Sequence, residues 1–160
     1  MKFLNIMFGF IVGVIVTGII GWIIMPGMML TEQLSPYSVE QTVEKITSNA
    51  KAEGWVISST QPLHKSVKKH GGGDLHPVIL INLCQADHAY KILQEDANKV
   101  ISVMMPCTIS VYQKSDGRVY VGTMNAGMLG TMFGGTVAEV MGGTVAAQQQ
   151  KIILFLREKE

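Results

Sequence analysis

The longest apolar stretch in the sequence lies at the N-terminus. No charged residue occurs from Phe3 to Thr31, and the apolar centre of this stretch runs from Ile6 to Met25. About 20 apolar residues in a helix are enough to cross the hydrocarbon core of a bilayer, where every backbone polar group must bond within the segment. The pattern therefore predicts one transmembrane helix, and residues 1–30 are expected to form a membrane anchor.

The main alternative to an anchor is a signal peptide that is cleaved. The residues from Trp22 to Leu30 offer no small-x-small cleavage site, which favours the uncleaved anchor. Lys2 precedes the apolar stretch, whereas the first cation after it is Lys45. Because positive charge tends to stay in the cytoplasm, the rest of the chain is expected on the other side of the membrane, in a periplasmic location.

Small residues recur at every fourth position within this stretch. On a helix they form one stripe, along which a second helix can approach closely. Glycine is also common in transmembrane helices without any such role. The stripe consists of Gly9, Gly13, Thr17 and Gly21. It has two interpretations: a helix contact within a homodimer or membrane complex, or only the usual abundance of glycine in such helices.

The rest of the chain predicts one α+β domain. Residues 31–37 are expected to form a linker, and residues 38–160 the domain itself, which is large enough for its own core. Ser38 and Gln41 have the spacing of a capping box, so a helix is expected to begin at Ser38 and to end before Gly54. Further helices are predicted at Leu63–His70, Asp87–Ala97, Met128–Phe133, Val137–Met141 and Val145–Arg157.

The strand predictions rest on apolar runs and turn residues. Val78–Leu83 is a continuous apolar run of strand length, typical of a buried strand in the middle of a sheet. Cys107–Tyr112 and Arg118–Met124 flank Ser115-Asp116-Gly117 and predict a hairpin. With a strand at Trp55–Ser59, this order predicts a mixed or antiparallel sheet with helices packed on one face, preceded by the transmembrane helix.

Composition narrows the possible partners and chemistry. The formal net charge is +1 at pH 7, and aromatic residues make up 7% of the chain, so no nucleic-acid interface is indicated. Two cysteines are too few for a disulfide framework, and they form no C-x-x-C motif. No arrangement of Ser, His and Asp or of paired carboxylates predicts a catalytic site.

The two cysteines nevertheless occupy notable positions. Cys84 ends the region of the predicted central strand, and Cys107 begins the hairpin. A disulfide between them is one alternative if the domain lies outside the cytoplasm. Two buried free thiols, which behave as small hydrophobic side chains, are the second alternative, and a ligand or reactive role is the third.

Sulfur atoms and imidazoles provide the candidates for a cofactor site. Thioethers, thiols and imidazoles suit copper(I) or haem iron, whereas no H-x-x-x-H or H-E-x-x-H motif indicates zinc. The alternative is that the methionines only fill a core or a dimer interface. The predicted cofactor-binding residues are His88, Cys84, Met104, Met128 and His64, and Met105, Cys107 and Met132 are expected near the same end of the sheet.

Several short segments resemble a known family. They are Ile81-Asn-Leu-Cys84, Met104-Met-Pro-Cys107, Met132-Phe-Gly-Gly135 and Val140-Met-Gly-Gly143, in this order. The sequence from Ser35 to Leu154 resembles the domain-of-unknown-function 302 family. The resemblance implies an α+β fold of the TATA-binding-protein-like kind, usually paired into dimers, and implies no activity.

Three functions are compatible with these observations. The first is a membrane-anchored, non-enzymatic binding or interaction domain that is dimeric or serves as an accessory of a membrane complex. The second is a redox protein that binds haem or copper through His, Met and Cys ligands. The third is a thiol-based redox enzyme that uses Cys84 or Cys107.

Overall fold

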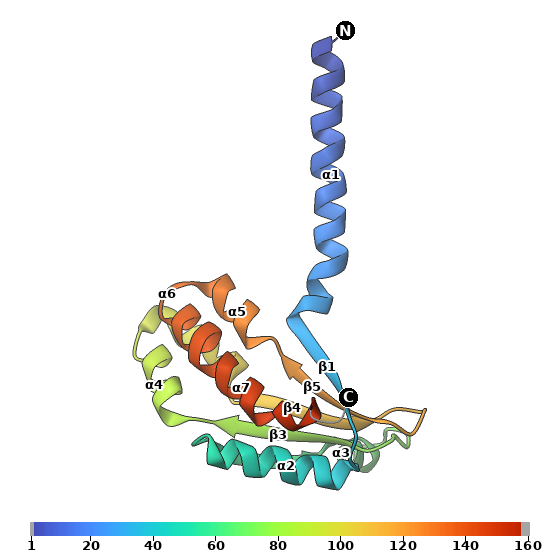
Figure 1. The fold of residues 1–160 in the computed structure, drawn as a ribbon, viewed down its shortest axis with the longest axis vertical. Helices are drawn as coiled ribbons and strands as arrows, with labels where there is room; N and C mark the ends of the chain where they lie inside the picture. The colour runs from blue at the N-terminus through green and yellow to red at the C-terminus, as the bar shows by residue number, and fades with distance from the viewer. Residues whose placement is uncertain (1, 158–160) are drawn as a thin grey trace.

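The computed structural model describes residues 2–157, and the side chains of residues 2–6, 8 and 26 are not described. Within these residues the chain forms one α+β domain from which a long helix projects (Figure 1). The sheet is antiparallel throughout, with five strands in the order β1-β5-β4-β3-β2. The strands are β1 (Leu30–Ser35), β2 (Val56–Pro62), β3 (Val78–Cys84), β4 (Cys107–Gln113) and β5 (Val119–Met124).

The helices come mostly in short segments that follow one another without long loops. The four before the hairpin of β4 and β5 are α1 (Lys2–Met29), α2 (Val39–Ala52), α3 (Leu63–Lys69) and α4 (Ala86–Leu93), followed by the 3-10 helix η1 (Asp96–Met104). After β5 come α5 (Ala126–Phe133), α6 (Gly135–Val137), the π-helix η2 (Ala138–Val145), α7 (Ala146–Ile152) and the 3-10 helix η3 (Leu154–Leu156).

The α+β class and several local predictions are confirmed. The side chain of Ser38 accepts a hydrogen bond from the backbone of Gln41, and the Gln41 side chain accepts one in return from the backbone N–H of Ser38. Gly54 and Gly117 have φ angles of 81° and 78°, a region that residues with a Cβ rarely adopt. These local signals depend only on near neighbours in the sequence, which is why the sequence shows them.

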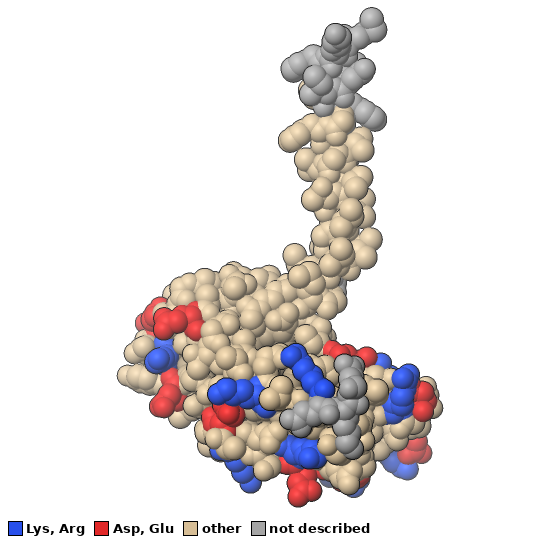
Figure 2. Space-filling model, viewed as in Figure 1, with Lys and Arg blue, Asp and Glu red and all other residues tan. Residues whose placement is uncertain are grey.

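The predicted membrane anchor over residues 1–30 is not supported. Helix α1 projects from the domain (Figure 1), and Figure 2 shows no Lys, Arg, Asp or Glu on its described part. Among the described residues, no helix has both the length and the apolar character needed to cross a membrane. The predicted transmembrane helix and the periplasmic location that depends on it are withdrawn on this finding.

The segment predicted as a linker over residues 31–37 is largely a strand. Residues Leu30–Ser35 form β1, an edge strand that pairs antiparallel with β5, with Thr31 opposite Thr123. The hydroxyls of these two threonines lie 2.6 Å apart. The pairing partner is 92 residues away in the sequence, so no local pattern indicates this strand.

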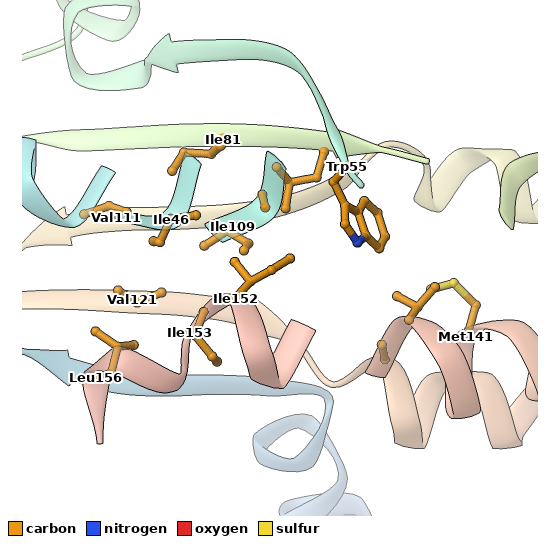
Figure 3. Close-up of a cluster of buried hydrophobic side chains, with 14 of the residues drawn as sticks. Ile46, Trp55, Ile81, Ile109, Val111, Val121, Met141, Ile152, Ile153 and Leu156 are labelled. Carbon is orange, nitrogen blue, oxygen red and sulfur yellow. The ribbon is translucent and has the colours of Figure 1, made fainter. Parts of the chain in front are cut away.

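The core lies between one face of the sheet and the helices that cover it. Odd-numbered residues of the three inner strands point to this face, as the period of two in a strand requires, and Ile81, Ile109 and Val121 lie in this layer. Figure 3 shows them facing the helical residues Ile152 and Ile153. The register is therefore fixed, because a slip by one residue would turn this apolar set away from the helices.

A close backbone approach joins α5 to the helices that follow it. A Cβ added to Gly130 would lie 2.4 Å from the backbone N of Gly142 and 2.9 Å from its Cα. Both atoms belong to backbone, so a side chain at Gly130 would force the two helices apart. A Cβ at Gly127, one turn earlier on α5, would meet only ordinary contacts, the nearest being Asn125 Oδ1 at 3.5 Å.

Substitution of Gly130 is therefore expected to destabilise the domain. Gly130→Ala should lower the free energy of unfolding by about 1–3 kcal/mol, the usual cost of overpacking. Gly127→Ala is the matched control and should be neutral or stabilising by up to about 1 kcal/mol, because alanine favours a helix. Urea unfolding followed by circular dichroism measures both, and equal midpoints for the two variants would contradict the close approach.

Candidate functional site

An apolar cavity lies where the pairing of β3 with β4 ends. The last pair of their register is Leu83 with Cys107. Beyond this pair, β3 leads into α4, and η2 extends past the end of the sheet. The helices at this end of the sheet therefore have no strand beneath them. The cavity consists of two adjoining chambers of about 20 and 30 Å³, each with room for one or two water molecules. Both chambers share walls made by Trp55, Leu83, Cys107, Met141 and Val145.

Both cysteines line the larger chamber, and we call it the thiol chamber. The smaller one, the inner chamber, extends toward Ile109, Met124 and Ile152. No Lys, Arg, Asp or Glu lines either chamber. The residues found only in the thiol chamber are Cys84, Gln85, His88, Ala89, Ile92, Met105 and Pro106.

Hydrogen bonding fixes the protonation pattern of His88. The indole Nε1–H of Trp55 donates to Gln148 Oε1 over 3.2 Å, and His88 Nε2 lies 2.9 Å from the same oxygen. Because indole nitrogen can only donate, the shared atom of Gln148 must be the amide oxygen. His88 Nε2 must then also donate, which leaves Nδ1 of the neutral ring as an acceptor. The rings of Trp55 and His88 pack edge to face with centroids 5.8 Å apart.

Gln85 lines the thiol chamber and carries a buried, unpaired oxygen. Its Oε1 atom is buried and has no hydrogen-bond partner among the described residues. The amide nitrogen Nε2 of Gln85 lies near Gly54, 3.8 Å from the position of a Cβ added to that glycine. A buried acceptor without a donor costs about 1–3 kcal/mol, so this oxygen favours a bound group that can donate.

Both cysteines are free thiols in this structure. Burial, and then the proximity of Cys84, raise the pKa of the Cys107 thiol from 9.0 to about 11. The protonated thiol therefore stabilises the fold below pH 9, and this contribution is lost as the pH rises toward 11. A thiol with a raised pKa is a poor nucleophile near neutral pH.

The structure separates the predicted cofactor residues into two groups. Cys84 and His88 line the thiol chamber, together with Met105 and Cys107. His64 is elsewhere, at the opposite end of β3, where its Nδ1 lies 3.2 Å from the backbone N of Val78. The other predicted or associated residues do not line either chamber, and these are Met104, Met128 and Met132.

The geometry of the chambers does not favour a metal or haem. Among the described residues, no three His, Cys, Asp or Glu side chains are grouped closely enough to hold a metal ion. A drug-sized ligand occupies a site of about 300–1,000 Å³, whereas the larger chamber measures about 30 Å³. A haem would not fit into this space without a large rearrangement of the helices.

A second polar cluster lies on the opposite face of the sheet. Glu32 accepts hydrogen bonds from the Tyr112 hydroxyl and from Lys114 Nζ, the latter over 2.7 Å. Lys114 and Tyr112 lower the pKa of Glu32, while burial and then Glu32 raise the pKa of Tyr112 to about 12. Tyr112 reaches Glu32 across Gly122, where a Cβ would lie 3.3 Å from the tyrosine ring. These groups satisfy one another and hold β1 to the sheet.

Several residues of the cavity have no signal in the sequence. Met141 and Gln148 belong to η2 and α7, two helices whose boundaries the sequence does not show. Gln85 precedes α4, and nothing in the sequence distinguishes it from other polar residues that precede helices. Trp55 directly precedes β2 and is 5% exposed. Figure 3 shows Trp55 and Met141 extending toward the same space from the strand side and the helix side.

The fold and the cavity define a small α+β domain with a single antiparallel sheet and an uncharged cavity at one sheet end. The model of the family described as "Domain of unknown function DUF302" matches residues 31–156, and the chain belongs to this family. The family prediction is thus confirmed for the domain, without the anchor. The comparison with curated proteins finds no match.

A solved structure has a similar fold. It is described as the crystal structure of the uncharacterized conserved protein DUF302 from Bacillus stearothermophilus. The similarity has a TM-score of 0.67 and covers 81% of this chain and 97% of the other, at 18% sequence identity. At this identity the comparison establishes the fold and leaves the function to be argued from the cavity.

The raised pKa predicts slow alkylation of Cys107. In a Cys84→Ser variant, iodoacetamide at pH 8 should react with the folded protein at least tenfold more slowly than with the urea-unfolded protein. A shift from 9.0 to about 11 lowers the thiolate fraction about a hundredfold at this pH, and burial slows the reaction further. Mass spectrometry of timed samples measures the alkylation rates. The Cys107→Ser variant is the control and reports the rate of Cys84 alone. Equal rates for the folded and the unfolded protein would disprove a buried neutral thiol at Cys107.

Proposed function

We propose that this chain is a non-enzymatic binding domain that takes a small uncharged molecule into the cavity beside Cys107. The observation that carries the proposal is the cavity itself, with the unpaired Gln85 Oε1 in its wall. Ligand sites in proteins are typically apolar with a small number of placed polar groups. The thiol chamber and the inner chamber have this character on a small scale.

The chemistry of the walls supports binding rather than catalysis. Lys, Arg, Asp and Glu are absent from the lining of both chambers, so no such residue there is placed to offset charge that develops in a transition state. Cys107 is held in its protonated form by burial. His88 Nε2 is engaged with Gln148, which fixes the ring as part of the wall.

Xenon tests the proposed cavity because it occupies small apolar spaces in proteins. Under xenon pressure, NMR signals from the Trp55 indole and the Met141 methyl group should shift in a saturable manner. Ala89→Leu should remove the effect, because Ala89 lines the thiol chamber and leucine would fill it. The control is Ala86→Leu on the same helix, at an exposed position, which should bind as the wild type does. Absence of saturable shifts in the wild type would refute the proposal.

Self-association through α1 is a second candidate function. The described side chains of this helix are apolar and exposed around the helix, with Phe10, Trp22 and Ile23 at 71%, 84% and 70%. A large exposed apolar surface favours contact with another apolar surface. A second copy of the chain supplies such a surface, and the predicted homodimer would be formed in this way.

The small-residue stripe offers a test of this second candidate. Apart from the adjoining residues and backbone of the helix itself, no atom of the described residues lies within 4 Å of a Cβ added to Gly9, Gly13 or Gly21, so the stripe is open to a partner helix. Gly13→Ile should weaken the dimer by at least several-fold by preventing close approach. Gly18→Ile, equally open within the chain but off the stripe, is the control. Sedimentation equilibrium of the full chain measures association, and equal constants for both variants would argue against the stripe.

A further inference from the structure

The hydrogen-bonding groups of the thiol chamber define the kind of molecule that it would accept. The inference rests on the proposed function, because it concerns the ligand of the same cavity. Gln85 Oε1 is a buried acceptor without a partner among the described residues. His88 Nδ1 is a second acceptor, since Nε2 donates to Gln148, and no hydrogen bond to Nδ1 is found within the described part of the chain.

Charge is the next constraint on the ligand. A charged molecule that enters an apolar chamber loses its hydration, and a counter-charge in the wall is needed to offset that cost. The linings of both chambers contain no Lys, Arg, Asp or Glu. The molecule must therefore be neutral, and most of its surface must be apolar to match the walls.

Size is limited by the wall between the chambers. Met141 and Val145 line both spaces and come from the π-helix η2, which is followed directly by α7. Methionine is unbranched, with three rotatable bonds, and adapts its shape easily. A change of its rotamer would enlarge the space beside it in the two chambers and admit a molecule larger than water.

From these three constraints we infer that the cavity binds a neutral, mainly apolar molecule with one O–H or N–H group, which donates to Gln85 Oε1. The donor removes the cost of the unpaired oxygen, and the apolar part occupies the space beside Trp55, Cys107 and Met141. A molecule of the same shape without the donor leaves the oxygen unpaired and binds less tightly.

Phenol and toluene form a matched pair of probes, because they differ only in a hydroxyl and a methyl group. Both are titrated into the wild type and into Met141→Ala, which enlarges the space, and dissociation constants are measured by NMR. Phenol should bind about tenfold more tightly than toluene, as expected for a hydrogen bond to an otherwise unpaired acceptor. In Gln85→Leu, alone and combined with Met141→Ala, toluene should bind more tightly than phenol.

Stability provides an independent readout and a control. Gln85→Leu should not lower the free energy of unfolding, because it removes an oxygen that has no partner in the described structure. Gln94→Leu, at an exposed position at the opposite end of α4 from Gln85, should leave the preference for phenol unchanged. Toluene binding as tightly as phenol in the wild type would overturn the inference and leave the proposed cavity intact. Failure of xenon, toluene and phenol alike would overturn both.

Discussion

The end of strand pairing between β3 and β4 is the constraint on which the cavity depends. Up to Leu83 and Cys107, each inward side chain has neighbours on both adjacent strands and a helix above it. Beyond this pair β4 has ended and β3 continues only to Cys84, opposite Val56, but η2 and α7 are one continuous helical run that extends past the sheet end (Figure 1). Dense packing needs apolar atoms on both sides of a layer, and past the sheet end the helical layer has no strand on its inner side.

The same position explains the chemistry of the groups around the cavity. Cys107 is the first residue of β4, at the sheet end beside the cavity, where burial keeps its thiol protonated. Gln85 follows the last residue of β3 and precedes α4, so it lies outside the strand pairing and lines the thiol chamber. Trp55 and His88 are held by one amide oxygen of Gln148. The end of strand pairing thus places satisfied polar atoms beside one, Gln85 Oε1, that has no partner among the described residues.

The sequence predicts elements that depend on near neighbours and misses those that depend on distant ones. The capping box at Ser38 and the glycine turns are visible because all their atoms come from a few adjacent residues. Strand β1 is not visible in the sequence, because it is short and its partner β5 lies far along the chain from it. The position of Cys84 and His88 at one sheet end follows from strand order. Met128 lines neither chamber, and it lies on α5, a helix that packs closely against Gly142 through Gly130, a contact between residues that are not near neighbours in the sequence.

The helical layer over the sheet end combines a rigid part with an adaptable part. Gly130 and Gly142 bring two backbones together, and this contact leaves no room for a side chain between the helices. Met141, adjacent to that contact, is 4% exposed and belongs to a π-helix. π-Helical segments occur frequently at functional sites, and the methionine side chain can change its shape while the backbone stays fixed. The size of the cavity can therefore change through one side chain without any loss of the packing that holds the domain together.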